Sequence, residues 1–233
     1  DLMGINTGDL THIIRQKELP QGSMGYKAGN FAANHFAGIK SALRPVLGLA
    51  NLGHSVLGTK AMSCITKGMH NVLGIPLWTP AMPKAYSIKS SQLTIDNDTL
   101  RNKNADKNGQ LKVVYFPSCI NQTMGLPKKS PVEQALASKM IALLQKGGYE
   151  VIFPENMEKL CCGTIWESKG MLDIADRKSA ELEAALWKAS EQGRYPVLCD
   201  QSPCLHRMRE TIHKMKLYEI GRASCRERVS SPV

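Results

Sequence analysis

The sequence predicts an α/β fold in which a small, cysteine-rich domain with a parallel sheet is preceded by a helical region. Two patterns support this prediction. From residue 112 onward, short apolar runs typical of strands alternate with longer segments of helical periodicity, whereas residues 25–74 show the helical pattern alone. The chain has 233 residues and a hydrophobic content of 42%, which is enough to bury a core.

The helical region comes first. Between residues 25 and 74, alanine, leucine and small residues recur with helical spacing, and we expect three short helices there. Pro45 is expected in the first turn of a helix, because proline has no amide hydrogen to donate in a helix interior. Three prolines from Pro76 to Pro83 predict an extended stretch, and the polar residues that follow predict a surface loop.

The cysteine-rich domain is expected to contain three strands, at residues 112–116, 149–153 and 195–199. The helices are expected over residues 131–147, opened by Ser130 and Pro131, over a long region that ends at Gly193, and from about Leu205 onward. Strands that alternate with helices in this way predict a parallel sheet with helices on both faces.

These patterns divide the chain into four segments. Residues 1–90 form the helical region, residues 91–111 a polar linker and residues 112–218 the cysteine-rich α/β domain. Residues 219–233 form a separate tail, because the stretch EIGRASCRERV resembles the translation of a common sequencing adapter. We therefore expect this tail to be read-through that plays no part in the fold.

Charge and composition exclude several classes of protein. The net charge of +10 at pH 7 is spread over helices and loops, with no arginine-rich strip interleaved with aromatic residues. This distribution argues against nucleic-acid binding. No stretch approaches the roughly 20 apolar residues that a transmembrane helix needs. The seven cysteines are too few and too unevenly placed for a disulfide scaffold, so we expect a reducing, cytoplasmic environment.

Five cysteines follow the three predicted strands. Cys119 lies just beyond the first strand, Cys161 and Cys162 lie in the connection beyond the second, and Cys199 and Cys204 lie at and beyond the third. The carboxyl ends of parallel strands open onto one crevice, where ligands bind in open α/β folds. We therefore expect thiolates from three loops to converge at this edge of the sheet.

Adjacent thiols at Cys161 and Cys162 suit a single zinc ion poorly, because zinc sites usually take their cysteines in spaced pairs. An iron–sulfur cluster contains several metal atoms and is held by thiolates, so adjacent cysteines can reach different irons. Gly163 would let the backbone come close to such a cluster, and the helix after it would direct its free amide hydrogens there. Cys64, alone on an apolar helix, is expected in the core.

These motifs carry a resemblance to known families. The order of Cys119, the CCG element and a later cysteine pair resembles the cysteine-rich CCG domain found in the iron–sulfur subunits of glycolate oxidases and in heterodisulfide reductases. Six blocks look more closely like the C-terminal part of FAD- and iron–sulfur-containing D-lactate dehydrogenases, of the FAD-linked oxidase family: INTGDL, AANHFA, LGIPLWTPAMP, FPSCINQTMG, CCGTIWESKG and CDQSPC. The resemblance covers nearly all of residues 4–218.

The resemblance implies a function. The chain would be the iron–sulfur electron-transfer portion of a flavin-dependent D-lactate (2-hydroxy acid) dehydrogenase, passing electrons from FAD to a quinone or cytochrome. An FAD domain and a ferredoxin-type domain would precede Asp1 in the natural protein, so this fragment alone is expected to be inactive toward lactate. The resemblance also implies a cytoplasmic location, with peripheral association at the inner membrane as a variant.

The resemblance further implies the ligands of a 4Fe–4S cluster, which would be Cys119, Cys161, Cys162 and Cys204. The family pattern ends in C-x2-C, but Gln201 stands where its first cysteine would be. Cys199 lies two residues earlier and is either a substitute ligand or a bystander. Lys169 and the amides that follow Gly163 would donate hydrogen bonds around the cluster.

Other functions remain open from the sequence. The iron–sulfur subunit of a glycolate oxidase or of a heterodisulfide reductase-like complex is an alternative of the same chemistry. A metal-free thiol–disulfide module would use the adjacent thiols reversibly and would be colourless. A helical docking subunit would use the apolar helices of residues 30–74 for a partner and keep its cysteines inert. Visible absorption after anaerobic reconstitution separates these classes.

Overall fold

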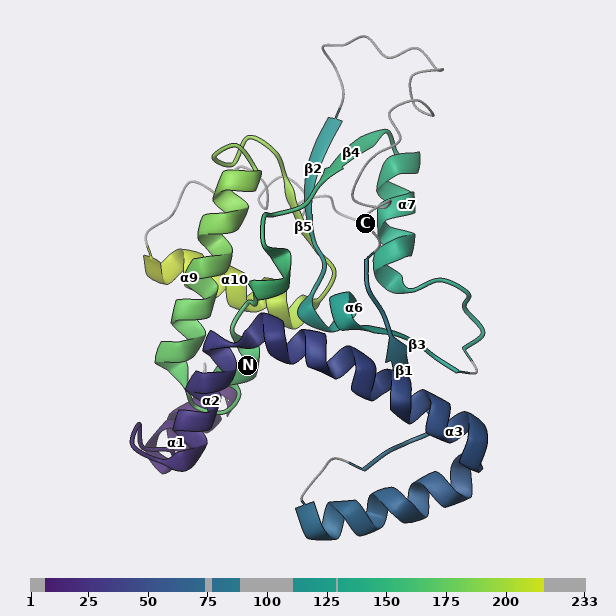
Figure 1. Cartoon of the computed structure of the whole chain (residues 1–233). Helices are drawn as coiled ribbons and strands as arrows, with labels where there is room; N and C mark the ends of the chain where they lie inside the picture. The colour runs from purple at the N-terminus through teal and green to yellow at the C-terminus, as the bar shows by residue number, and fades with distance from the viewer. Residues whose placement is uncertain (1–6, 74–76, 89–110, 129, 216–233) are drawn as a thin grey trace.

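The computed structural model describes residues 7–73, 77–88, 111–128 and 130–215 (Figure 1). In this part of the chain the protein is mixed α/β, and a small parallel sheet is covered by helices, as predicted. The elements are α1 (Thr7–Glu18), α2 (Met24–Asn34), α3 (Phe36–Leu73), β1 (Pro83–Ala85), β2 (Leu111–Phe116), α6 (Cys119–Thr123), β3 (Met124–Pro127), α7 (Leu136–Lys146), β4 (Tyr149–Ile152), the 3-10 helix η1 (Met157–Lys159), α8 (Thr164–Glu167), α9 (Leu172–Ala189), β5 (Val197–Cys199) and α10 (Ser202–Met215).

The three predicted strands form one parallel sheet in the order β4-β2-β5. The central strand β2 pairs with β4 through Val113 and Val151, and with β5 through Phe116 and Cys199. Residues 113–116 of β2 are all buried, which explains why the sequence reads there as a continuous apolar run. Because all three strands run the same way, the segments after them leave the sheet at one edge.

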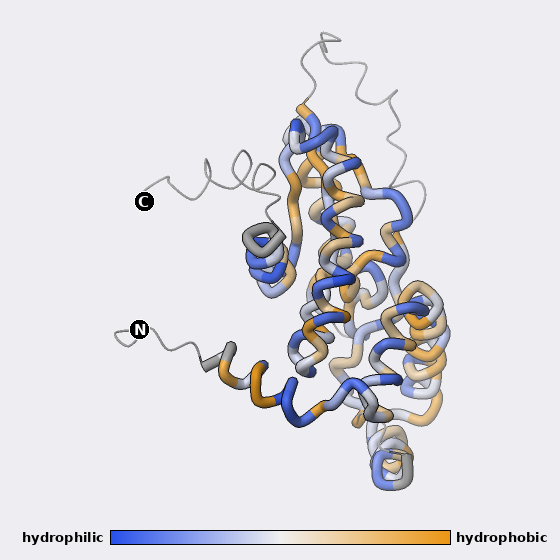
Figure 2. The backbone as a smooth tube through the Cα atoms, turned by 90° about the vertical axis from the view of Figure 1, so that its left-hand side faces the viewer, coloured by the Kyte–Doolittle hydropathy of each residue, from blue (hydrophilic) through white to orange (hydrophobic). Residues whose placement is uncertain are grey.

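The core lies on both faces of this sheet. On one face, α7 packs Ile141 against Val113 and Val151. On the other face, Val114 and Phe116 pack against apolar residues of α8, α9 and α10. In Figure 2 the hydrophobic colour follows the strands through the interior of this layered half. The predicted arrangement of helices on both faces is therefore confirmed.

Several predicted helix boundaries are wrong. α7 begins at Leu136, not at Pro131, because the Ser130 hydroxyl accepts the amide hydrogen of Val132 at 3.1 Å and holds the chain in a turn there. The long helical region is two helices, α8 and α9, separated by a turn at residues 168–171. α10 begins at Ser202, three residues before the predicted start.

The N-terminal half is helical, but its helices differ from those predicted. α1 was not expected, and Pro45 lies inside α3 rather than in a first turn. Lys40 and Leu47 are buried on either side of Pro45, so packing outweighs the hydrogen bond that proline cannot make. α3 is kinked at Gly58, which has a φ of 75° inside the helix.

A two-stranded antiparallel ribbon, which the sequence analysis did not predict, joins the two halves. β1 follows the proline-rich stretch and pairs with β3, which comes from the cysteine-rich half. The amide of Tyr86 also donates to the carbonyl of Thr123 at 2.8 Å. Of the stretch predicted to be extended, only Pro83 belongs to β1. Residues 79–82 form a turn instead, in which the Met82 amide donates to the Thr79 carbonyl at 3.0 Å.

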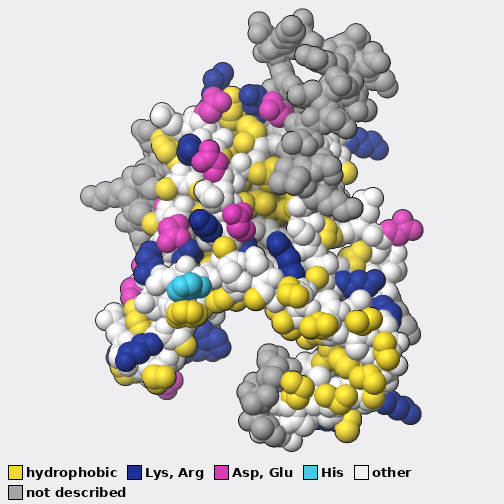
Figure 3. Space-filling view, viewed as in Figure 1, with side chains coloured by type: hydrophobic (Ala, Val, Ile, Leu, Met, Phe, Trp, Pro, Cys, Tyr) yellow, Lys and Arg dark blue, Asp and Glu magenta, His cyan; other side chains and the backbone are white. Residues whose placement is uncertain are grey.

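One face of α3 is apolar and exposed. Its exposed residues include Ile39, Val46, Leu49, Leu52 and Val56. In Figure 3 hydrophobic side chains gather over α3 at the lower right of the molecule. An exposed apolar face of this kind is typical of an interaction surface, and contact with an upstream domain stays a prediction.

Two predicted segments lie largely or wholly outside the described residues: the linker at 91–111, of which only Leu111 is described, and the tail at 219–233. In the part of the chain that is described, no helix has both the length and the apolar character needed to cross a membrane.

Candidate functional site

The five cysteines after the strands lie together at the carboxyl edge of the sheet. Cys119 begins α6 and Cys199 ends β5, whereas Cys161 and Cys162 lie between η1 and α8, and Cys204 lies in the first turn of α10. Cys161, Cys162 and Cys204 are buried, and the other two are half-buried. All five carry free thiols. The parallel register of the sheet therefore gathers cysteines that are up to 85 positions apart in the chain, as predicted.

The thiols form a row in which each interacts with its neighbours. The side chain of Cys161 interacts with those of Cys119 and Cys162, and the side chain of Cys204 interacts with those of Cys162 and Cys199. These electrostatic interactions link the five thiols in the order Cys119, Cys161, Cys162, Cys204, Cys199. The adjacent pair stands in the middle of the row and connects its two ends.

The pKa values alternate along this row. The pKa of Cys161 is raised chiefly by its interaction with Cys119, and that of Cys204 chiefly by its interaction with Cys162. The pKa values of Cys119 and Cys162 are lowered chiefly by Cys161, and that of Cys199 chiefly by Cys204. The shifts have one physical cause, which is that neighbouring buried thiols cannot all ionise together.

Three of the cysteines also form hydrogen bonds with the backbone. The amides of Ile120 and Thr164 donate to Cys119 and Cys162, whereas the Cys199 thiol donates to the Gln201 carbonyl at 3.8 Å. The hydroxyl of Thr164 lies 3.2 Å from the Cys162 sulfur as well. Donors of this kind stabilise negative charge on sulfur, and they tune the reduction potential of thiolate-bound clusters.

Asp200 fastens two of the cysteine loops together. Its carboxylate accepts hydrogen bonds from the amide of Ser118 at 2.8 Å, from the Tyr115 hydroxyl at 2.9 Å and from the Asn121 side chain at 2.9 Å. Asp200 directly follows Cys199, whereas its donors flank Cys119. The two ends of the thiol row are therefore held by one carboxylate.

Gly163 packs closely against helix α9, and its place beside a cluster stays a prediction. Its φ is +90°, and a Cβ atom at this position would lie 2.4 Å from the carbonyl oxygen of Ala175 in α9. The space beside Gly163 is thus filled by the helix, and glycine is required so that the CCG loop can pack against α9. The hydroxyl of Ser179, also in α9, donates to the carbonyl of Cys162 at 2.6 Å and completes this attachment.

Replacement of Gly163 by alanine should destabilise the fold by about 3 kcal/mol or more, because it adds a clash with a helix backbone to the strain of a positive φ. Gly148 is the matched control, since its φ is +82° and no atom lies within 4 Å of the added Cβ. Gly148→Ala should cost only about 1–2 kcal/mol, which is the strain alone. Urea unfolding of both variants measures the difference, and equal losses would contradict the packing role of Gly163.

Lys169, the predicted side-chain donor, is exposed in the turn after α8. The basic residue that does reach the thiols is Lys40 of α3, which the sequence analysis missed. Lys40 is 5% exposed, and its charge interacts with the sulfurs of Cys119 and Cys161. Burial lowers its pKa to about 8. Helical spacing places Lys40 on the same face of α3 as Phe36 and Leu47. This spacing is the sequence pattern that could have indicated its burial.

Cys64 and His206 both lie at the surface of the protein. Cys64 is exposed on α3, so its predicted place in the core is wrong. His206, the histidine nearest the site in sequence, has a side chain that is 74% exposed and lies 3.4 Å from Glu210. It is therefore a surface residue.

The donor set suits an iron–sulfur cluster in its chemistry. Five soft sulfur donors come from three loops, amide hydrogens point at two of them, and apolar residues such as Phe36 and Trp166 pack in the same cluster. Among the residues described, however, no three His, Cys, Asp or Glu side chains are placed to hold a metal ion as they stand. The cysteine side chains would therefore have to rearrange to bind metal atoms.

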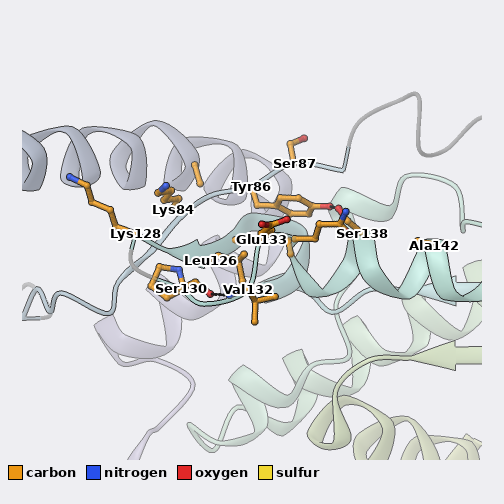
Figure 4. Close-up of a pocket in the computed structure, with 15 residues that line it drawn as sticks. Lys84, Tyr86, Ser87, Leu126, Lys128, Ser130, Val132, Glu133, Ser138 and Ala142 are labelled. Atoms are coloured by element: carbon orange, nitrogen blue, oxygen red, sulfur yellow. Dashed lines mark hydrogen bonds between the residues drawn. The ribbon is translucent and has the colours of Figure 1, made fainter.

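A pocket of about 800 Å³ lies away from the thiols, between the β1–β3 ribbon and the segment that leads into α7 (Figure 4). The hydroxyl of Tyr86 lies 2.6 Å from that of Ser138 across it. The ammonium of Lys128, on its rim, donates to the Ser55 hydroxyl of α3 at 2.6 Å. The pocket shares no residue with the thiol row.

The fold and the thiol row define an α/β protein with a buried, cysteine-lined sheet edge. Comparison with protein-family models, curated proteins and solved structures gives no match. The function is therefore argued from the chemistry of the site together with the motifs in the sequence.

Proposed function

We propose that this chain is the iron–sulfur electron-transfer portion of a flavin-dependent D-lactate (2-hydroxy acid) dehydrogenase. One observation carries the proposal: five cysteine side chains from three strand ends interact in a single row at one edge of the sheet. A free cysteine is commonly a small core residue, but burial alone does not gather five of them at one edge of a sheet.

Each group around the row has a task in this proposal. The cysteines would supply the thiolate ligands, with Cys161 and Cys162 able to reach different metal atoms. A bound cluster would accept and release one electron at a time. The backbone amides that donate to the sulfurs would set the potential at which this happens, and the buried position of the row would keep water away from the sulfurs.

The 2-hydroxy acid part of the proposal depends on the sequence resemblance. FAD and the substrate would bind on an upstream domain, and a quinone or cytochrome would take the electrons onward. A protein that also carries the flavin domain should lose part of its visible cluster absorption when D-lactate is added anaerobically. If D-lactate leaves that absorption unchanged while glycolate reduces it, the glycolate oxidase alternative would replace this part of the proposal.

Anaerobic reconstitution with iron and sulfide tests the central proposal. The wild-type protein should become brown, bind on the order of four iron and four sulfide per chain, and give a paramagnetic signal in one redox state. Iron and sulfide analysis, visible absorption and electron paramagnetic resonance measure these properties. A colourless protein without a paramagnetic signal would contradict the proposal.

A thiol–disulfide module is the second candidate, and the electrostatic interactions between free thiols favour it. Cys161 interacts with Cys119 and Cys162 interacts with Cys204, so each of these pairs is a candidate for oxidation to a disulfide. Two thiols would lose two electrons and two protons to an added disulfide such as oxidised glutathione, which is reduced to two thiols as one S–S bond forms. In that case the metal-free protein should lose two titratable thiols and regain them with dithiothreitol.

A further inference from the structure

The most exposed apolar residues of α3 lie on one side of the helix. Val46, Leu49, Leu52 and Val56 follow one another at spacings of three or four residues, and each is more than half exposed. At 3.6 residues per turn, this spacing puts them in one row along the helix. Leu47 is buried, so the other side of the same turns faces the protein interior. The row of four is called the α3 apolar face below.

The segment around this face carries basic residues but no acidic ones. Between Glu18 and Asp96 the sequence contains no Asp or Glu, whereas seven lysines and arginines occur there. Within α3, residues 45–59 carry no Asp, Glu, Lys or Arg at all, and the next basic residues along the helix, Lys60 and Lys67, are exposed. An uncharged apolar stretch is thus continued by positive charge without any negative charge.

A basic side chain also reaches the face from the cysteine-rich half. Lys128, which directly follows β3, donates from its ammonium to the Ser55 hydroxyl at 2.6 Å and so stands next to Val56. Figure 3 shows hydrophobic side chains gathered over α3, with lysine and arginine side chains along their edge. The surface is therefore apolar in its middle and positive at its border.

This combination favours one kind of partner over two others. A second copy of the chain would bring the same positive border against itself, and like charges repel. A partner helix would need a groove for its apolar side chains. Neither the pocket of about 800 Å³ nor a cavity of about 340 Å³ beside Phe36 is lined by the α3 apolar face. An anionic lipid surface needs no groove, because apolar side chains enter it directly while lysines are attracted to its headgroups.

We propose that the α3 apolar face docks this protein onto the surface of a membrane that contains anionic lipids. The four apolar side chains enter the boundary between headgroups and acyl chains, and the helix lies in the plane of the membrane. The basic residues around the face contact the lipid phosphates. This inference goes beyond the iron–sulfur proposal and does not depend on it, because none of the five clustered cysteines takes part.

Vesicle sedimentation with the full chain tests the inference. Vesicles with about 30% phosphatidylglycerol should bind the protein at least about tenfold more tightly than pure phosphatidylcholine vesicles, because each basic residue near an anionic surface adds to the attraction. Leu49→Gln removes an apolar side chain that would enter the membrane and should weaken binding by about tenfold. Leu143→Gln is the matched control, since Leu143 on α7 is 64% exposed and Leu49 is 68% exposed. It should leave binding unchanged.

Three results would overturn the inference. Vesicle binding that is equal in the wild type and in Leu49→Gln would show adsorption by charge alone. No vesicle binding, together with a dimer that Leu49→Gln dissociates in analytical ultracentrifugation, would assign the face to a second copy. No vesicle binding by a monomeric chain would leave the face to a protein partner. Urea unfolding of Leu49→Gln should match the wild type, because the side chain is exposed, and this separates lost binding from lost fold.

Discussion

Replacing Cys161 or Cys162 by serine should abolish most of the iron and sulfide that the wild-type protein incorporates. Each of these two sulfurs interacts with neighbours on both sides, so either loss divides the row. A hydroxyl is a poor substitute because iron–sulfur chemistry uses soft thiolates. Both side chains are at most 3% exposed, and neither loop needs to move for a serine to fit. Iron and sulfide analysis after anaerobic reconstitution measures the effect.

The other cysteines supply the controls. Cys64→Ser changes an exposed thiol on α3 and should leave iron incorporation unchanged. Cys199 and Cys204 interact with each other at the far end of the row, so their serine variants show which of them is a ligand. Iron retained in Cys199→Ser and lost in Cys204→Ser would assign the ligand to Cys204, as the family pattern implies. Full incorporation in both Cys161→Ser and Cys162→Ser would contradict the proposed centre.

Replacing Arg207 by methionine should reduce the free energy of unfolding by about 3–5 kcal/mol. The Arg207 guanidinium is fully buried in α10 and forms ion pairs with Glu167 of α8 and Asp176 of α9. It thus joins three helices beside the thiol row. Its removal leaves the Glu167 carboxylate, which is only 12% exposed, without its ion-pair partner.

Arg209 is the matched control for this prediction. It lies two residues further along the same helix and is exposed, so Arg209→Met removes the same charge without breaking a buried pair. Arg209→Met should change the free energy of unfolding by no more than about 0.5 kcal/mol. Denaturant unfolding of the metal-free proteins measures both variants. Similar small losses for Arg207 and Arg209 would show that the buried ion pairs contribute little beyond an apolar replacement.

The sequence predicted the sheet and the convergence of the cysteines because both depend on local pattern and one topological rule. Apolar runs identified the three strands, and a parallel sheet brings the segments after Phe116, Ile152 and Cys199 to one edge. The contacts along the thiol row do not follow from that rule. They depend on how each loop packs, for example on Gly163 against α9 and on Asp200 against Ser118.

The failures have a common physical cause, which is that tertiary contacts outweighed local preference. Pro45 is tolerated inside α3 because the helix packs on both sides of it, and no helix rule anticipates such support. The three-residue strand β1 is too short to give a periodic pattern, and it exists because β3 lies beside it. Local sequence does not distinguish Lys40 from a surface lysine, because its burial depends on the position of α3 over the sheet edge.

The β1–β3 ribbon makes the N-terminal helices and the cysteine-rich half one structural unit. It pairs a strand from before residues 89–110 with a strand from after them, and the indole of Trp166 donates to the Gly29 carbonyl across the same boundary. The N-terminal helices and the cysteine-rich half are therefore held together by contacts as well as by the covalent chain. If the chain were cut between the two halves, the two fragments would be expected to stay associated, as in a split protein. A chimera should therefore carry both halves from the same protein.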